Sequence, residues 1–227
     1  MGKKLPESLL IEAEARFEPL QYECRDNVGI VRSYDCRNFI YLTFRDTGDD
    51  GQCMVATAEL RICDYPDVET MVDVADENGD SLEAALAAYN YIGLRRIDLE
   101  DYPSISVCEI HTLYISPQYR GCGLSKRLFL MVPELLLAYT GRQEAICTAY
   151  INPFREQSEL KGSASIKKDY SYAEADEELI EVMRSTLTNT GFIQTGEAAR
   201  SFATDTEELR RMAIRQNLDL DCRDIFI

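Results

Sequence analysis

Residues 105–151 constrain the fold more than any other part of the chain, because their polarity pattern changes in a fixed order. Residues 105–115 alternate with a period of two, which is typical of a strand. Gly121-Cys122-Gly123 is a turn signal, and from Leu124 to Gly141 apolar residues recur at helical spacing. Residues 144–151 are a short apolar run that indicates a buried strand. Strand, helix and strand in this order predict a βαβ unit with parallel strands.

The alternation in the first of these strands predicts which side chains share a face. One set is Ile105, Val107, Glu109, His111, Leu113 and Ile115, and the other is Ser106, Cys108, Ile110, Thr112 and Tyr114. The helix that follows contains Pro133, which has no backbone N–H, so we expect a kink or a division there.

A hairpin is predicted ahead of the βαβ unit. Residues 38–44 are rich in aromatic and β-branched residues, residues 46–51 form a strong turn signal, and residues 53–62 return as a second strand. These features indicate two antiparallel strands. Further toward the amino terminus, the pattern from Ser8 to Arg16 predicts a short helix.

The remaining helices are predicted by their apolar spacing. One follows the capping residues Asp80-Ser81 and ends at Gly93. A second covers residues 174–190, and a third covers residues 207–216. The inward face of the second is predicted to carry Leu179, Val182, Met183, Thr186 and Leu187.

The chain contains no internal repeat and no linker that divides it cleanly. We therefore expect a single domain over residues 1–227, with an insertion at about 64–103 and a long loop at about 153–174. Loops and insertions carry specificity on many folds, so both segments are expected to shape a substrate site.

The charge of the chain restricts its partners. With 40 acidic and 24 basic side chains, the formal net charge is −16. Nucleic acids are bound through basic surfaces, so this balance argues against DNA or RNA as a partner. Cationic partners such as amines remain compatible with it, although a mostly solvated acidic surface is the simpler and preferred explanation of the charge.

Neither a membrane span nor a metal site is expected from the sequence. No run of about 18 apolar residues occurs. Acidic sequence rather than an apolar signal core follows the first residues, which favours a cytoplasmic protein. A structural zinc site needs pairs of cysteine or histidine ligands close together in the sequence. The 8 cysteines are scattered along the chain, and His111 is the 1 histidine, so the sequence does not predict such a site. We expect reduced, mostly buried thiols.

The glycine turn has the features of a phosphate-binding site. Glycine allows close approach of the backbone, and the first amides of a helix lack intrahelical partners at the positive end of the dipole. Arg120 adds a charged donor beside the turn. A dinucleotide fingerprint would need glycine where Lys126 stands, and no P-loop run occurs in the sequence.

What remains is the pattern Gln118-x-x-Gly121-x-Gly123, preceded by Leu113-Tyr114-Ile115-Ser116-Pro117 and followed by Leu124-Ser125-x-x-Leu128. This stretch resembles the acetyl-coenzyme A signature of the GNAT N-acetyltransferase superfamily. The resemblance implies an α/β fold in which a mixed, mostly antiparallel sheet contains a central βαβ unit and splayed parallel strands, flanked by helices. It implies transfer of an acetyl group from acetyl-coenzyme A to a primary amine of a small molecule, peptide or protein.

The order of the predicted elements resembles that of the superfamily over roughly residues 35–205. A clear match of the sequence itself is limited to about residues 105–152 and 187–195. It implies that acetyl-coenzyme A is the co-substrate, with the strand end beside the pantetheine arm and the turn around the pyrophosphate. The residues that the resemblance implies contact acetyl-coenzyme A are Leu113, Tyr114 and Ile115 on the strand; Arg120, Gly121, Cys122, Gly123, Leu124 and Ser125 at the turn; and Asn152 after the next strand.

The resemblance also implies a base. An ammonium must lose a proton before its nitrogen attacks a thioester. Some branches of the superfamily carry the base at the position of Glu109, sometimes with a histidine at that of His111. Glu109 is therefore the expected general base, with His111 assisting or sharing the role. A structural ion pair for Glu109 and a packing role for His111 are the alternatives.

The usual acid of the superfamily is a tyrosine, and here that position is Leu187. Tyr150, Tyr170 and Tyr172 are substitutes by sequence proximity only. Two other functions stay open. A long-chain N-acyl amino acid or acyl-homoserine synthase would share the architecture with another acyl donor, and the missing tyrosine at Leu187 suggests a non-catalytic acyl-coenzyme A-binding module. The intact glycine turn favours acetyl-coenzyme A over an acyl carrier protein. No motif specifies the acceptor amine, and a homodimer is compatible with the sequence.

Overall fold

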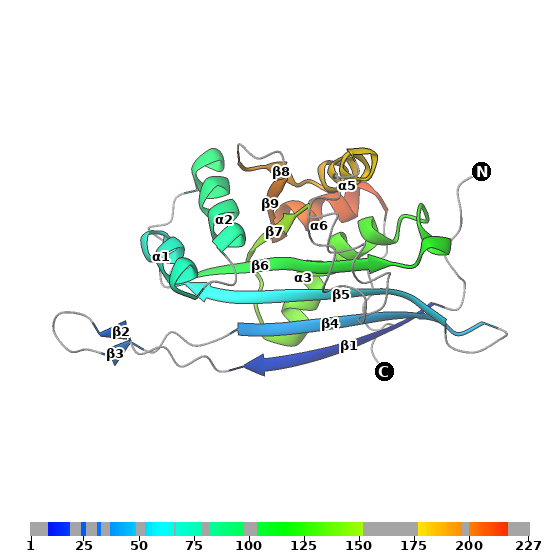
Figure 1. Cartoon of the computed structure of the whole chain (residues 1–227), viewed down its shortest axis with the longest axis horizontal. Helices are drawn as coiled ribbons and strands as arrows, with labels where there is room; N and C mark the ends of the chain where they lie inside the picture. Colours follow the sequence, from blue (N-terminus) through cyan, green and yellow to red (C-terminus); the bar gives the residue numbers. More distant parts are fainter. Residues whose placement is uncertain are drawn as a thin grey trace, which may run out of the picture.

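The computed structural model describes residues 9–18, 24–25, 31–32, 37–48, 53–65, 67–78, 82–97, 104–151, 177–196 and 200–217. Its main strands are β1 (Leu9–Glu18), β4 (Arg37–Asp46), β5 (Cys53–Tyr65), β6 (Ile105–Ile115), β7 (Ile146–Tyr150), β8 (Ile193–Gln194) and β9 (Ser201–Asp205). They form a 7-stranded sheet in the order β1-β4-β5-β6-β7-β9-β8 (Figure 1). Two short strands, β2 (Cys24–Arg25) and β3 (Val31–Arg32), pair separately.

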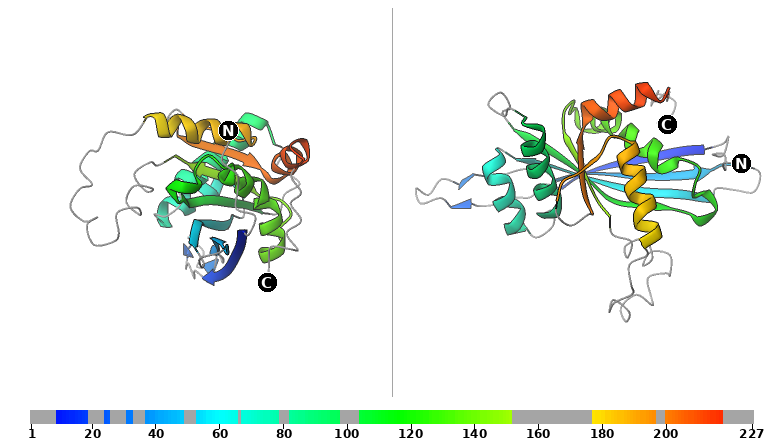
Figure 2. Two further views of the ribbon diagram at one scale, coloured as in Figure 1. Left: turned by 90° about the vertical axis from the view of Figure 1, so that its right-hand side faces the viewer. Right: turned by 90° about the horizontal axis from the view of Figure 1, so that it is seen from above.

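Helices lie on both faces of this sheet. They are α1 (Val68–Asn78), α2 (Leu82–Arg95), α3 (Leu124–Thr140), α5 (Glu177–Asn189) and α6 (Thr206–Arg215), with a 3₁₀ turn η1 (Pro117–Tyr119) before α3. Figure 2 shows α1 and α2 at one end of the molecule and α5 and α6 toward the other. In the described part of the chain β6 and β7 are the only parallel neighbours in the sheet. The predicted mixed, mostly antiparallel sheet flanked by helices is confirmed.

Two hydrophobic cores hold the helices to the sheet. In the larger core, Leu128 and Leu135 of α3 pack with Leu42 and Leu60 of the hairpin, and every one of these side chains is buried. The smaller core joins α1 and α2 to the opposite face, with Tyr91 of α2 among its largest buried side chains. The cores therefore mark the two faces of the sheet, and this distinction locates the site residues below.

The predicted helix from Ser8 to Arg16 is wrong, because this stretch belongs to the edge strand β1. β1 pairs antiparallel with β4 along its whole length. Ile11 is buried in the larger core while Glu12 is exposed and bound to Arg45 of β4. Alanine and glutamate favour helices in isolation, but here the period-two pattern and the pairing with β4 decide the structure.

The hairpin and the βαβ unit are confirmed. β4 and β5 pair antiparallel, and β6, α3 and β7 follow as predicted, with β6 and β7 parallel. α3 ends at Gly141, whose φ of 71° is the left-handed conformation that a helix end commonly requires. The expected division at Pro133 does not occur, since α3 is a single helix that contains this buried residue.

The predicted end of α2 at Gly93 is wrong, because the helix continues beyond this residue. α2 continues to Arg95, and Arg96 takes the left-handed conformation with a φ of 52°. The amides of Arg96 and Ile97 then bond to the carbonyls of Gly93 and Ile92. This is a Schellman closure, in which a non-glycine residue supplies the positive φ.

The expected insertion contains α1 and α2, and the expected loop at 153–174 lies outside the described residues. The expectation of mostly buried thiols does not hold for the described cysteines. Cys108 and Cys147 are buried, whereas Cys53 is exposed and Cys63 and Cys122 are half-buried. No helix in the described part of the chain is long and apolar enough to cross a membrane.

Candidate functional site

A β-bulge in β6 sets the geometry of the candidate site. Ile110 pairs with Leu60 of β5, and the next pair joins Thr112 to Glu59, so His111 is the extra residue. One inserted residue moves every later side chain to the other face of the sheet. The prediction that Glu109, His111, Leu113 and Ile115 share a face is therefore wrong beyond the bulge.

The register shows which face each part of β6 occupies. Before the bulge, Val107 lies in the smaller core and Ile110 in the larger one. After it, Leu113 and Ile115 pack against the larger core, on the same face as Ile110. Glu109 therefore faces the side of α1 and α2, while the strand end faces α3 and α5.

β6 and β7 separate at the same level. Their last paired residues are Ile110 and Ala149. Directly after β7, the amide of Ile151 bonds to the carbonyl of Arg200, 2.9 Å away, so the chain stays paired on the side of β9 while its pairing with β6 has ended. β6 continues to Ile115 with β5 as its partner. A gap between the two parallel strands follows.

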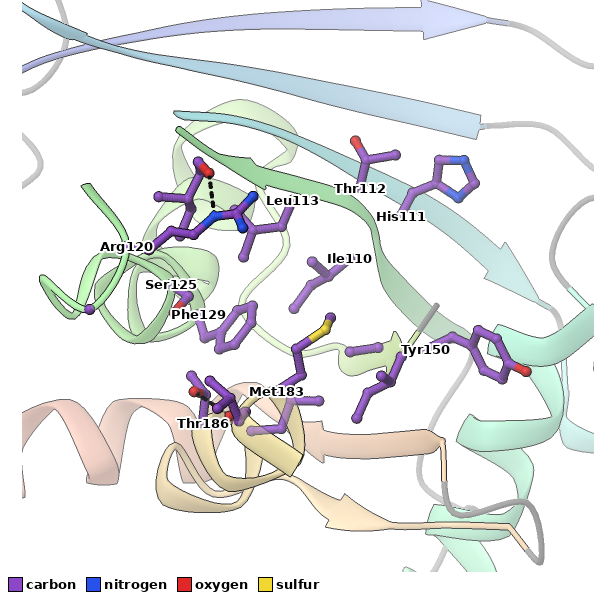
Figure 3. Close-up of a pocket in the computed structure, with 16 residues that line it drawn as sticks. Ile110, His111, Thr112, Leu113, Arg120, Ser125, Phe129, Tyr150, Met183 and Thr186 are labelled. Carbon is purple, nitrogen blue, oxygen red and sulfur yellow. Dashed lines mark hydrogen bonds between the residues drawn. The ribbon is translucent and has the colours of Figure 1, made fainter. Parts of the chain in front are cut away.

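A cavity of about 180 Å³ occupies this gap on the side of α3 and α5 (Figure 3). Its lining is Ile110, His111, Thr112, Leu113, Ile115, Arg120, Gly121, Ser125, Phe129, Ala149, Tyr150, Ile151, Val182, Met183, Thr186 and Leu187. Figure 3 shows Ile110 and Leu113 pointing toward Phe129 and Met183. The cavity is therefore an apolar slot that ends at the glycine turn.

The glycine turn leaves space for a ligand. Gly121 and Gly123 have φ angles of 81° and 80°, which favour glycine. A Cβ added to either would meet no atom of the described residues within 4 Å. The first intrahelical bond of α3 joins the Arg127 amide to the Gly123 carbonyl, and no side chain caps the helix in the described part of the chain. The amides before Arg127 are thus available to an anion.

Contacts with the hairpin of β4 and β5 hold this turn in place. The Ser116 amide bonds to the Val55 carbonyl at 2.9 Å, and the Ser116 hydroxyl donates to the Met54 carbonyl at 2.8 Å. The Tyr119 hydroxyl donates to Asp46 at 3.1 Å. Three hydrogen bonds to the hairpin therefore fix the turn before any ligand binds.

Arg120 reaches from the turn over the cavity. Its Nε donates to the Ile115 carbonyl at 3.0 Å, which is drawn as a dashed line in Figure 3. Its Nη2 is buried and has no hydrogen-bond partner among the described residues. A buried guanidinium nitrogen without a partner is costly, so it is a strong candidate for binding an anionic ligand.

Glu109 and His111 form a buried pair next to the gap. Glu109 Oε1 lies 3.2 Å from His111 Nδ1, and the two side chains are 12% and 13% exposed. Across the sheet, Glu109 is paired in register with Arg61 of β5 and Thr148 of β7. A carboxylate in this position can receive a proton at the point where the strands separate.

The structure brings together part of the predicted site. His111, Leu113, Ile115, Arg120, Gly121 and Ser125 line the cavity, and Gly123 and Leu124 form the start of α3 beside it. Tyr114 lies on the opposite face of β6 from Leu113, Cys122 lies in the turn outside the lining, and Glu109 lies behind the cavity on the other face. Asn152 lies outside the described residues.

The Ile115 carbonyl, at the end of β6, accepts the hydrogen bond from Arg120 Nε within the chain.

Several lining residues were missed by the sequence analysis. Phe129 lies one helical turn beyond Ser125, and this spacing could have placed it on the same face. Met183, Thr186 and Leu187 were predicted to face inward, but they line a cavity rather than a closed core. The apolar spacing of a helix is the same whether its inward face packs in the hydrophobic core or lines a cavity.

Leu187, the residue that the resemblance aligns with a tyrosine acid, is buried and lines the cavity. Tyr150 is the only tyrosine of the described lining, and Figure 3 shows its hydroxyl pointing away from Phe129 and Met183. Tyr170 and Tyr172 lie outside the described residues.

In the part of the chain that the structure covers, no group of 3 or more His, Cys, Asp or Glu side chains could hold a metal. The chain matches no protein-family model, and no curated protein is significantly similar to it in sequence. The gap between β6 and β7, the glycine turn and the buried pair of Glu109 and His111 are therefore the features that indicate a function.

Proposed function

We propose that the chain is a GNAT-type N-acetyltransferase, which transfers the acetyl group of acetyl-coenzyme A to a primary amine of a small molecule, peptide or protein. One observation carries the proposal. The parallel strands β6 and β7 separate directly beside an uncapped helix start and a glycine turn. The element order and the bulge at His111 support a GNAT-type fold.

The residues present fit acetyl-coenzyme A. The open space over Gly121 and Gly123 and the unpaired Nη2 of Arg120 suit a diphosphate. The apolar slot suits a pantetheine arm, since Leu113 and Phe129 supply apolar surface along it. When bound, acetyl-coenzyme A supplies an acetyl group activated as a thioester.

The chain's own contribution is to receive a proton. In the proposed mechanism, Glu109 accepts the ammonium proton of the acceptor, directly or through a water molecule. His111 holds one carboxylate oxygen of Glu109 in place. Because Glu109 lies on the face opposite the cavity, the acceptor would approach from that face and meet the thioester in the gap.

The departing thiolate needs no protein acid in this proposal. A thiol has a pKa of about 8.5, so its anion is a tolerable leaving group near neutral pH. The apolar Leu187 is compatible with this, but it is also what a non-catalytic acyl-coenzyme A-binding module would show. That module is the second candidate function.

The proposal is tested by calorimetry with acetyl-coenzyme A and with longer acyl thioesters, followed by thiol-release assays with a panel of amines. We expect acetyl-coenzyme A to bind and to raise the melting temperature, because a ligand that binds the folded state stabilises it. Thiol release with an amine would support the transferase. Binding without release would support the non-catalytic module, and a preference for longer chains would support a long-chain acyltransferase. Absence of binding at millimolar acetyl-coenzyme A would contradict the enzyme and the module together.

Replacing Arg120 with alanine is expected to weaken acetyl-coenzyme A binding about 10-fold, because a charge-assisted bond to phosphate is lost. The salt dependence of binding should also decrease, since one cation fewer faces the diphosphate. Titrations at two salt concentrations measure both effects. Arg211→Ala, an exposed arginine on α6, is the matched control. Equal affinity in the Arg120 and Arg211 variants would exclude Arg120 from the site.

A further inference from the structure

We infer that Met183 of α5 sets the length of the acyl chain that the cavity accepts, so that the donor is acetyl-coenzyme A or a thioester with a similarly short chain. This role rests on the proposed function and deepens it, because it specifies which acyl thioesters bind. It concerns the end of the cavity away from the glycine turn, where the acyl group would follow the pantetheine arm.

The paired strands β6 and β7 close this end of the cavity. The lining follows β6 from Ile115, before the glycine turn, back to Ile110. Ile110 pairs with Ala149, and the pair before them on the same face is Cys108 and Cys147. Both thiols are 0% exposed. An acyl chain therefore cannot continue along the sheet beyond Ile110 without opening the larger core.

The wall on the side of α3 is also fixed. Phe129 is buried, and its ring meets the ring of Phe192 edge to face, with centroids 5.7 Å apart. Such a contact favours one relative orientation of the two rings. Leu187, on the inward face of α5, is buried as well. These side chains are packed against the core and leave a ligand little room to displace them.

Met183 forms the adaptable wall of the cavity. Figure 3 shows its thioether pointing toward Ile110 across the cavity. The residue is half-buried, and its neighbour Val182 is 57% exposed, so this part of α5 borders solvent. Methionine is unbranched and flexible, and it fills irregular gaps. The size of side chain 183 therefore decides how far an acyl chain can extend before it meets α5.

The expected effect follows from the burial of methylene groups. Each buried methylene contributes a factor of about 4 in affinity when an apolar pocket has room for it. In the parent, carbons beyond the acetyl group must push Met183 toward solvent, so they should not contribute this factor. Met183→Ala removes most of the side chain and leaves room for them. Met183→Leu keeps a similar volume and should keep the parent's preference.

Calorimetry with acetyl-, butyryl- and octanoyl-coenzyme A tests the role of Met183. We expect the parent to bind octanoyl-coenzyme A about 10-fold more weakly than acetyl-coenzyme A, and Met183→Ala to bind the two about equally. Met212→Ala is the matched control, because Met212 of α6 packs against the same core but does not line the cavity. Met212→Ala should keep the parent's preference. An unchanged preference in Met183→Ala, or an equal change in Met212→Ala, would overturn the inference.

Coenzyme A without an acyl group is titrated in parallel to separate this role from the proposed function. It should bind equally to the parent and to Met183→Ala, because the substitution lies beyond the thiol. If coenzyme A binds but all chain lengths bind alike in both proteins, the inference fails and the coenzyme site stands. If neither coenzyme A nor any thioester binds, the proposed function fails, and the inference fails with it.

A second measurement locates the acyl chain directly. The chain has 6 methionines, so spectra of methyl-labelled methionine contain few signals, and the signal lost in Met183→Ala identifies Met183. We expect butyryl-coenzyme A to shift this signal further than coenzyme A does, because the added acyl group meets the thioether. The Met212 signal, identified in the same way, should respond equally to both ligands. Equal shifts of the Met183 signal with the two ligands would place the acyl chain elsewhere and overturn the inference.

Discussion

Gly121→Ala is expected to weaken acetyl-coenzyme A binding about 100-fold, equivalent to about 2.8 kcal/mol, in a chain that still folds. The φ of Gly121 is 81°, so alanine adds backbone strain of about 1–2 kcal/mol. Within the described part of the chain the new Cβ meets no atom within 4 Å, so the free protein can accommodate it. It would instead occupy the space through which a diphosphate must approach the amides at the start of α3.

The control is Gly141→Ala, at the other end of the same helix. Gly141 has a φ of 71°, and a Cβ there also meets no atom within 4 Å in the regions that the structure covers. The two variants should therefore lose similar stability in urea denaturation, while calorimetry should detect weaker binding in Gly121→Ala alone. An equal loss of affinity in both would assign the effect to backbone strain, and parent-like affinity in Gly121→Ala would place the diphosphate elsewhere.

The segment around this turn was the most predictable part of the chain because its information is local. Alternation, paired glycines and helical spacing follow one another within residues 105–151, and each pattern has one favoured structure. The structure has the corresponding strand, turn, helix and strand. Gly141 likewise ends α3 as its position predicts, because a helix end commonly needs a positive φ.

The parts that could not be predicted depend on partners distant in sequence. The residues of β1 favour a helix by composition, but they form a strand because all of them pair with the edge of β4. The bulge at His111 arises from the pairing between β5 and β6, and nothing in residues 105–115 marks it. That bulge separates Glu109 from Leu113 and so decides which face of the sheet the cavity and the proposed base each occupy.

The lining of the cavity shows the same limit. The slot exists because β7 ends while β6 continues, so Leu187 and Met183 face a cavity although their spacing is that of any core helix. Arg120 and Gly121 were found from sequence because turn chemistry restricts residue type. Apolar positions carry no comparable restriction, since any side chain of suitable volume fits.

Glu109→Gln is expected to lower kcat about 1,000-fold while acetyl-coenzyme A binds as to the parent. Glutamine keeps the size of the side chain and can still accept a hydrogen bond from His111, but it cannot take the ammonium proton. Affinity is retained because Glu109 lies on the face of β6 opposite the cavity. Single-turnover rates and calorimetry on the same preparation separate the two quantities.

The variant should recover part of its rate at high pH, where more of the acceptor amine is already deprotonated and the base matters less. Glu12→Gln, which removes a carboxylate paired with Arg45 on the edge strand, is the control for loss of one negative charge from the sheet. Its rate should match that of the parent at every pH. If Glu109→Gln also matched the parent, the ammonium proton would have another acceptor, and the buried pair with His111 would be a structural contact beside the gap rather than the base within it.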